Sequence, residues 1–127
     1  MKVLLSIKPE YADKIFCGEK KYEFRRAIFK RKGVNRVVVY ASAPVGRVIG
    51  EFEIESIISD DLHSLWENTK MFAGISMDYF HDYFCGKETG YAIKIKNYIK
   101  YEESYDIKSK YGICPPQSFA YLGATEN

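Results

Sequence analysis

Hydrophobic residues recur along this sequence at two different spacings. Some short segments are continuously apolar or alternate apolar with polar side chains, which is the pattern of β-strands. These predicted strands span residues 3–7, 21–25, 36–40, 48–57, 91–95 and 118–122. Three other segments carry apolar residues at helical spacing. Gly18 is expected to cap the C-terminus of the first of these helices. Ser59 or Asp60 is expected to be the N-cap of the second, and Ser76 the N-cap of the third. These predicted helices span residues 10–17, 61–70 and 77–84.

The order of these elements favours an α+β domain. Strands outnumber the helices that could cross between parallel strands, so a small mixed or antiparallel β-barrel of five to six strands fits best, with about three short helices over its openings. The acidic, tyrosine-rich stretch 98–111 is predicted to be a variable connection, and residues 123–127 a frayed tail. Residues 1–127 are predicted to form a single domain.

Composition restricts the class of protein. The chain has 127 residues, 46% hydrophobic, with 11 Tyr, 8 Phe and 1 Trp, which excludes a disordered or low-complexity polypeptide. Its longest apolar runs fall far short of the roughly 20 residues that span a bilayer. The apolar stretch at the N-terminus is also too short for a signal peptide, so we expect a cytoplasmic protein that does not bind membranes.

Charge is divided along the chain although the net charge is only +2. Residues 19–36 contain eight basic residues and two acids, whereas residues 51–88 contain nine acids and two lysines. The basic segment is a candidate for binding phosphates, and its alternative is an ordinary solvated loop. The acidic helical face over residues 60–88 would suit a basic protein partner.

Several familiar kinds of active site are absent from the sequence. It has no phosphate-binding glycine loop, no H-E-x-x-H and no G-x-S-x-G. Cys17, Cys85 and Cys114 are far apart and form no C-x-x-C pair, and His63 and His81 are 18 residues apart and share no motif. We therefore expect neither a metal nor a cofactor.

The segment GEKKYEFRR, residues 18–26, carries the densest candidate chemistry. Along a strand, Glu23 and Arg25 share one face, and Lys20 joins them only if it lies in the preceding turn. Together with Lys8, such a cluster would bind an anion, Glu23 would accept a hydrogen bond from an amino group, and neighbouring cations would lower the pKa of Lys20. The alternative is a surface strand with ordinary ion pairs.

The same segment resembles the start of an ASCH domain, a branch of the PUA-like superfamily. The hallmark G-x-K-x-x-E-x-R is matched at Gly18, Lys20, Glu23 and Arg25, and the order of the downstream segments agrees through to PPQSFAYL. The resemblance implies a PUA-like barrel and a cleft, lined by the motif, that binds RNA, a nucleotide or a modified base.

Strand order extends this expected cleft beyond the motif. We place Lys8 and Ser42 at its rim, with Gln117 and Ser118 nearby. Tyr22, Phe24 or Tyr40 could stack on a base, although strand parity favours core positions for all three.

The resemblance also implies two enzymatic alternatives. Some small ASCH proteins hydrolyse N(4)-acetylcytidine with the motif lysine, a threonine three residues later and a glutamate in the helical segment. Here Glu23 occupies the threonine position, and residues 71–76 lack a carboxylate, although Glu67 and Asp78 flank that stretch. Other members are linked to RNA cleavage, which Lys20, Glu23 and Arg25 could support. Sequence therefore favours a binding module and leaves catalysis by Lys20 and Glu23 open.

Overall fold

A computed structural model describes residues 1–123 of the chain. Of the predicted tail 123–127, all but Gly123 lies outside the described residues. The elements run in the order β1 (Lys2–Ile7), α1 (Pro9–Phe16), β2 (Tyr22–Arg25), β3 (Arg36–Ala41), β4 (Arg47–Asp61), α2 (Leu62–Thr69), a 3-10 turn (Lys70–Phe72), α3 (Met77–Tyr83), β5 (Thr89–Tyr105), α4 (Ile107–Tyr111) and β6 (Phe119–Tyr121). The α+β prediction is confirmed.

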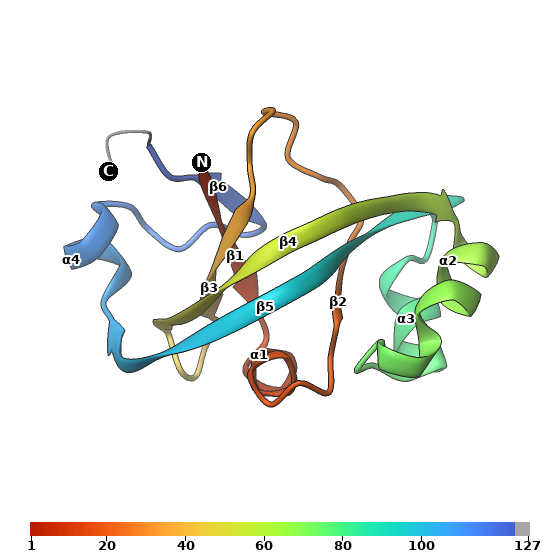
Figure 1. Ribbon diagram of the computed structural model, residues 1–127, viewed down its shortest axis with the longest axis horizontal. Coiled ribbons are helices and arrows are strands. Elements are labelled where there is room, and N and C mark those ends of the chain that lie inside the picture. Colours follow the sequence, from red (N-terminus) through yellow and green to blue (C-terminus); the bar gives the residue numbers. More distant parts are fainter. Residues whose placement is uncertain (124–127) are drawn as a thin grey trace.

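The described strands form one curled, half-barrel sheet in the order β2-β5-β4-β3-β1-β6. The β1–β3 pair is parallel and every other neighbouring pair is antiparallel, so the sheet is mixed. The long strands β4 and β5 run side by side across the molecule (Figure 1). The edges of the sheet are β2, from the N-terminal quarter of the chain, and β6, from its C-terminal end.

The prediction of a variable connection at residues 98–111 is wrong. Strand β5 continues to Tyr105, and α4 follows it from Ile107 to Tyr111. The far half of β5 is mostly exposed, so its side chains give little burial signal. Its backbone is held by pairing with β4, which extends from Val48↔Tyr105 through several bulges. The sequence pattern of residues 98–105 therefore could not show that they form a strand, because their pairing with the long strand β4 decides it.

Both faces of the central strands are buried. Val3, Leu5 and Ile7 of β1 lie in the main core with α1, whereas Leu4 points into a second cluster that contains Ile107 of α4. This two-sided burial explains the continuous apolar run that predicted β3.

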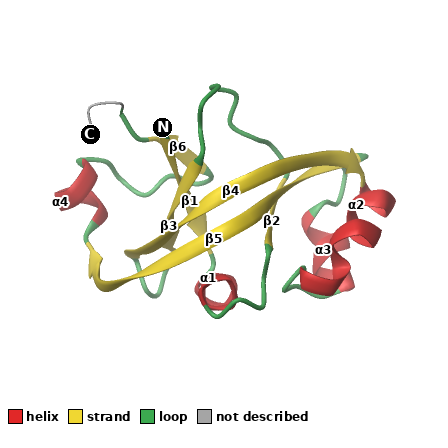
Figure 2. Ribbon diagram, viewed as in Figure 1, coloured by secondary structure: helices red, strands yellow, loops and turns green. Residues whose placement is uncertain are grey.

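Helices α2 and α3 lie together at one end of the long strands, and α4 lies at the other (Figure 2). A third core cluster joins Phe24 of β2 to Leu65 of α2, to Phe80 of α3 and to Phe84, the residue that follows α3. The side chain of Ser76 caps α3 as predicted, but Asp61 caps α2 instead of Ser59 or Asp60, because β4 continues up to Asp61. Within residues 1–123, no helix is long and apolar enough to cross a membrane.

Candidate functional site

A cleft of about 420 Å³ opens between β2, α3 and the chain segments beside β1 and β6. Its lining comes from distant parts of the sequence: Ser6, Ile7, Lys8, Tyr11, Lys20, Glu23, Phe24, Arg25, Arg26, Ala27, Ser42, Ile75, Tyr79, Tyr83, Gln117 and Ser118. The structure thus gathers the predicted motif and rim residues around one cleft, with the exception of Gly18.

Gly18 shapes the turn that delivers Lys20 to the cleft. Its φ of +87° follows the end of α1, and a Cβ added there would lie 3.1 Å from the Tyr98 hydroxyl. The turn is closed by the N–H of Lys20, which donates to the Lys14 carbonyl over 3.0 Å. The motif glycine therefore has a conformational role, because L-residues rarely adopt this φ.

Lys20 is a buried cation. Only 3% of the residue is exposed, its Nζ donates to the Ala73 carbonyl over 2.7 Å, and the same atom lies 4.9 Å from the centre of the Phe24 ring. Burial lowers the pKa of Lys20 to about 8; Glu23 opposes this shift and Lys14 adds slightly to it. The predicted lowering is present, but its main cause is desolvation, with no contribution resolved from Lys8 or Arg25.

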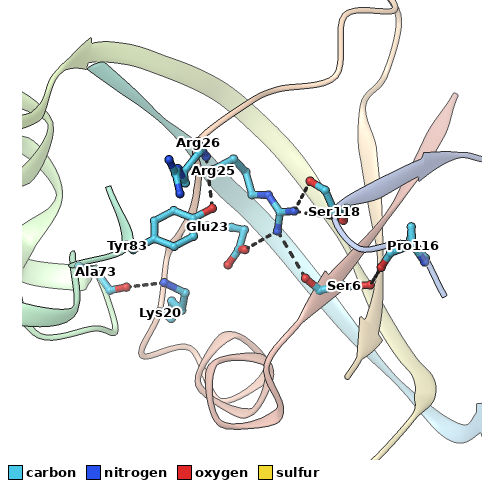
Figure 3. A network of polar contacts seen from close by, with 9 residues as sticks. All are labelled: Ser6, Lys20, Glu23, Arg25, Arg26, Ala73, Tyr83, Pro116 and Ser118. Carbon is cyan, nitrogen blue, oxygen red and sulfur yellow. Dashed lines mark hydrogen bonds and ion pairs between the residues drawn. The ribbon is translucent and has the colours of Figure 1, made fainter. Parts of the chain in front are cut away.

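Glu23 and Arg25 form a buried ion pair of 3.2 Å on one face of β2, as strand parity predicts. The Arg25 guanidinium also donates to the Ser6 carbonyl and to both the carbonyl and the hydroxyl of Ser118, at 3.4, 3.1 and 2.8 Å (Figure 3). Arg25 thus links strand β2 to the β1 and β6 side of the cleft. These internal bonds make it a structural clasp between the two sheet edges.

Of the three cations that sequence suggested for anion binding, only Lys8 is exposed at the cleft. The charge of Arg25 is neutralised by Glu23. Lys20 has no ion-pair partner among the described residues, but it is buried and its Nζ donates to the Ala73 carbonyl. Lys8 and Arg26 are exposed at the cleft and supply positive charge there. The backbone N–H of Arg26 is itself fixed by donating to the Tyr83 hydroxyl over 3.2 Å.

Tyrosines that sequence reasoning did not select form one wall of the cleft. The rings of Tyr79 and Tyr83, one helical turn apart on α3, are nearly parallel at 12° with centres 6.3 Å apart. Tyr11 of α1 packs against Tyr79 at 5.1 Å. The repeated Tyr-Phe pairs of α3 were the available signal, because Phe80 and Phe84 enter the core and leave the tyrosines on the adjoining face. Among the earlier stacking candidates, Tyr40 lies in the second core cluster and Tyr22 packs against the third.

The segment 71–76 reaches the site without a carboxylate. It contributes the Ala73 carbonyl to Lys20 and Ile75 to the cleft wall. Glu67 pairs with Lys70 outside the cleft and Asp78 does not line it. Glu23 is consequently the sole carboxylate among the described lining residues, and the described chain contains no His, Cys, Asp and Glu group suited to a metal.

Comparison with known proteins identifies the family. The ASCH domain family matches residues 5–114. This chain belongs to the ASCH domain family. An ASCH domain-containing ribonuclease of Zymomonas mobilis is 32% identical over 97% of this chain and 85% of its own length.

Solved structures agree with this membership. The crystal structure of ASCH from Zymomonas mobilis superposes with a TM-score of 0.90, at 31% identity over 98% of this chain and 90% of that one. The N-terminal domain of Staphylothermus marinus McrB shares the fold alone, with a TM-score of 0.51 and 14% identity over 89% of this chain and 80% of that one. The protein thus has the small α+β, PUA-like fold of ASCH structures.

The structure divides the basic segment of this ASCH domain into two groups. Lys20 and Arg25 are buried, and Arg36 pairs with Glu51. The remaining cations are exposed just before β2 and on the loop that follows it: Lys21, Arg26, Lys30, Arg31 and Lys32. The loop after β2 carries positive charge from Arg26 at the cleft to β6, where Arg31 lies 4.2 Å from the centre of the Tyr121 ring.

Proposed function

We propose that this ASCH protein binds single-stranded RNA in the cleft and cleaves its phosphodiester backbone. The observation that carries the proposal is a nearly buried lysine, with a pKa of about 8, on the wall of a cleft that also presents exposed cations. The similarity to the Zymomonas ribonuclease over almost the whole chain favours cleavage over binding alone.

Lys20 is suited to accept a proton. With a pKa of about 8, roughly a tenth of the molecules carry a neutral amine at pH 7, far more than for a solvated lysine. In the proposed reaction the neutral Nζ takes the proton of an RNA 2′-hydroxyl while that oxygen bonds to phosphorus. The bond to the 5′-oxygen breaks, and the 5′-oxygen takes a proton from solvent. Lys8 and Arg26 would hold the phosphate, because their charges are not neutralised by a buried partner.

Cleavage of a fluorescent single-stranded RNA tests the role of Lys20. Lys20→Met should lower the rate by at least about a hundredfold, the usual contribution of a general base, because its thioether cannot accept the proton. The wild-type rate should rise with pH and level off above about pH 8 as Lys20 loses its proton. Lys21→Met is the matched control, since its Nζ contacts the exposed Phe72 ring and does not line the cleft.

Unchanged cleavage by Lys20→Met would remove Lys20 from the mechanism. RNA binding by the wild type without any cleavage would leave a binding module, the function that sequence alone favours.

A modified nucleoside is the second candidate ligand. The observation in its favour is the cleft volume, about 420 Å³, near the lower end of the range for small-molecule sites. Thermal stabilisation by free nucleosides, N(4)-acetylcytidine included, would distinguish it from RNA. Hydrolysis of N(4)-acetylcytidine is less well supported, because residues 71–76 offer only backbone and apolar groups to the cleft.

We expect this function to be cytoplasmic. Cys17, Cys85 and Cys114 are all exposed and free, as suits a reducing compartment. Binding of a basic protein by the acidic helical face stays a prediction.

A further inference from the structure

We infer that the cleft contains a subsite for one unpaired nucleobase that bears an amino group, with Tyr79 as its stacking surface and Glu23 as the group that selects it. This inference rests on the proposed function, because it concerns the RNA that enters the same cleft. It adds a class of base, and it requires that the base be outside a duplex.

The stacking surface is the ring of Tyr79, and the lysine that covers one face of this ring can be displaced by a base. Tyr79 is half-buried, braced by Tyr11 and Tyr83, and lines the cleft. The Lys8 ammonium lies 5.2 Å from the centre of its ring, and Lys8 is exposed. A ring face covered by an exposed lysine is accessible to a base, since the ammonium can move to the adjacent phosphate.

Glu23 supplies the hydrogen-bond acceptor. Its Oε2 is engaged by Arg25, whereas its Oε1 accepts no hydrogen bond from any residue that the structure describes. The described chain also has no fully buried side-chain oxygen without a partner, so Oε1 must retain contact with the cleft. A carboxylate oxygen held in this way accepts from the amino group of cytosine, adenine or guanine. Uracil presents a carbonyl at the position of the cytosine amino group and would oppose the carboxylate.

The size of the cleft limits what can enter. A volume of about 420 Å³ is enough to hold a single nucleotide, and Tyr79 and Glu23 reach only a base whose ring face and pairing edge are both free. RNA reading of this kind depends on bases that are splayed out of a helix. The subsite therefore favours single strands over duplexes of the same sequence.

Fluorescence anisotropy with short oligonucleotides tests the subsite independently of cleavage. The probes are labelled octauridine and octamers in which one central uridine is replaced by cytidine, adenosine or guanosine. Every nucleotide of each probe carries a 2′-fluorine in place of its 2′-hydroxyl, so no bond of the probe can be cleaved by transesterification. We expect the cytosine probe to bind about tenfold more tightly than octauridine, the effect of one hydrogen bond to a charged group. Annealing the cytosine probe to its complement should abolish this advantage.

Glu23→Gln should reverse the preference. The amide oxygen can keep the bond to Arg25, and the amide NH₂ then faces the cleft as a donor, which suits the uracil carbonyl. Tyr79→Ala should weaken binding of every single-stranded probe by at least about fivefold through the loss of stacking. Tyr105→Ala is the matched control, because Tyr105 also lies beneath a lysine, 4.8 Å from Lys110 Nζ, and does not line the cleft.

Two results would overturn the inference: equal affinity for the cytosine and uracil probes, or equal effects of Tyr79→Ala and Tyr105→Ala. If Glu23→Gln fails to fold, as judged by circular dichroism, two measurements still test the inference. These are the binding of the cytosine and uracil probes by the wild type and the comparison of Tyr79→Ala with Tyr105→Ala. Cleavage of ordinary RNA without base preference would contradict this subsite alone. Base-selective binding without cleavage would contradict only the proposed nuclease activity.

Discussion

At the residue scale, burial of Lys20 lowers the stability of the folded protein and makes the Lys20 amine a better proton acceptor. Its side chain occupies a space that an apolar residue would fill at less cost, because a buried ammonium has lost most of its hydration. The same loss lowers its pKa to about 8 and makes a neutral amine available near neutral pH. Proton-accepting ability and instability therefore have one physical origin.

Lys20→Met should consequently stabilise the protein. The folded pKa of about 8 lies below the ordinary 10.5, so the unfolded chain binds the extra proton between these values and wild-type stability rises with pH there. The gain in unfolding free energy should be at most about 3 kcal/mol below pH 8 and should vanish above pH 10.5. The Ala73 carbonyl, left without its donor, reduces this gain.

Urea unfolding of both proteins at pH 7 and pH 10.5 measures the difference. A variant that is less stable than wild type at pH 7 would show that the hydrogen bond to Ala73 outweighs the burial of charge.

At the element scale, the segment between α2 and α3 positions Lys20 as much as β2 does. Gly74 has a φ of +70°, and a Cβ added there would lie 2.6 Å from both Cβ and Cγ of Lys20. Sequence predicted both flanking helices through their apolar spacing and the Ser76 cap. The sequence did not predict this contact, because Gly74 and Lys20 are more than fifty positions apart and glycine has no side chain whose pattern could indicate a partner.

Gly74→Ala should therefore affect both stability and cleavage. The left-handed backbone alone costs about 1–2 kcal/mol for an L-residue, and the overlap with Lys20 adds to it while displacing Nζ from its place at the cleft. Gly86→Ala is the matched control, since Gly86 has a φ of +85° and nothing lies within 4 Å of an added Cβ. Thermal melting and cleavage rates compare the two, and equal loss of activity would show that the contact with Lys20 has no effect on the site.

At the scale of the whole molecule, the cleft is assembled from segments that are far apart in the sequence. The strand parity of Glu23 and Arg25 could be predicted from local pattern. The pairing of Arg25 with Ser118, ninety-three residues away, could not, because it requires the curl of the sheet to bring β2 opposite β6. Tyr79 and Tyr83 were missed for a similar reason, since only the packing of α3 shows which of its faces meets the cleft.

The exposed cations of the loop after β2 should set the salt dependence of RNA binding. Each phosphate contact on a single strand contributes about −0.7 to the slope of log affinity against log salt. Combined replacement of Lys30, Arg31 and Lys32 by Ala should lower the magnitude of that slope by about 2 and leave the preference among bases unchanged.

Anisotropy titrations from low to moderate salt measure the slope. The matched control replaces three exposed lysines outside the cleft: Lys96, Lys100 and Lys108. The same reduction in both triple variants would mean that RNA follows no defined path from the cleft.

The clasp formed by Arg25 joins two edges of the sheet that are not paired as strands. Strands β2 and β6 stand at opposite edges of the sheet, and the guanidinium bridges them through side-chain hydrogen bonds instead of a backbone ladder. The loop after β2 is also held to β6, because the N–H groups of Lys30 and Arg31 donate to the Tyr121 hydroxyl. Side chains, and no strand pairing, therefore join these two edges. The cleft itself opens at the surface beside this seam. We therefore expect RNA to need no free end to enter it, so a circular and a linear RNA of the same sequence should bind equally well.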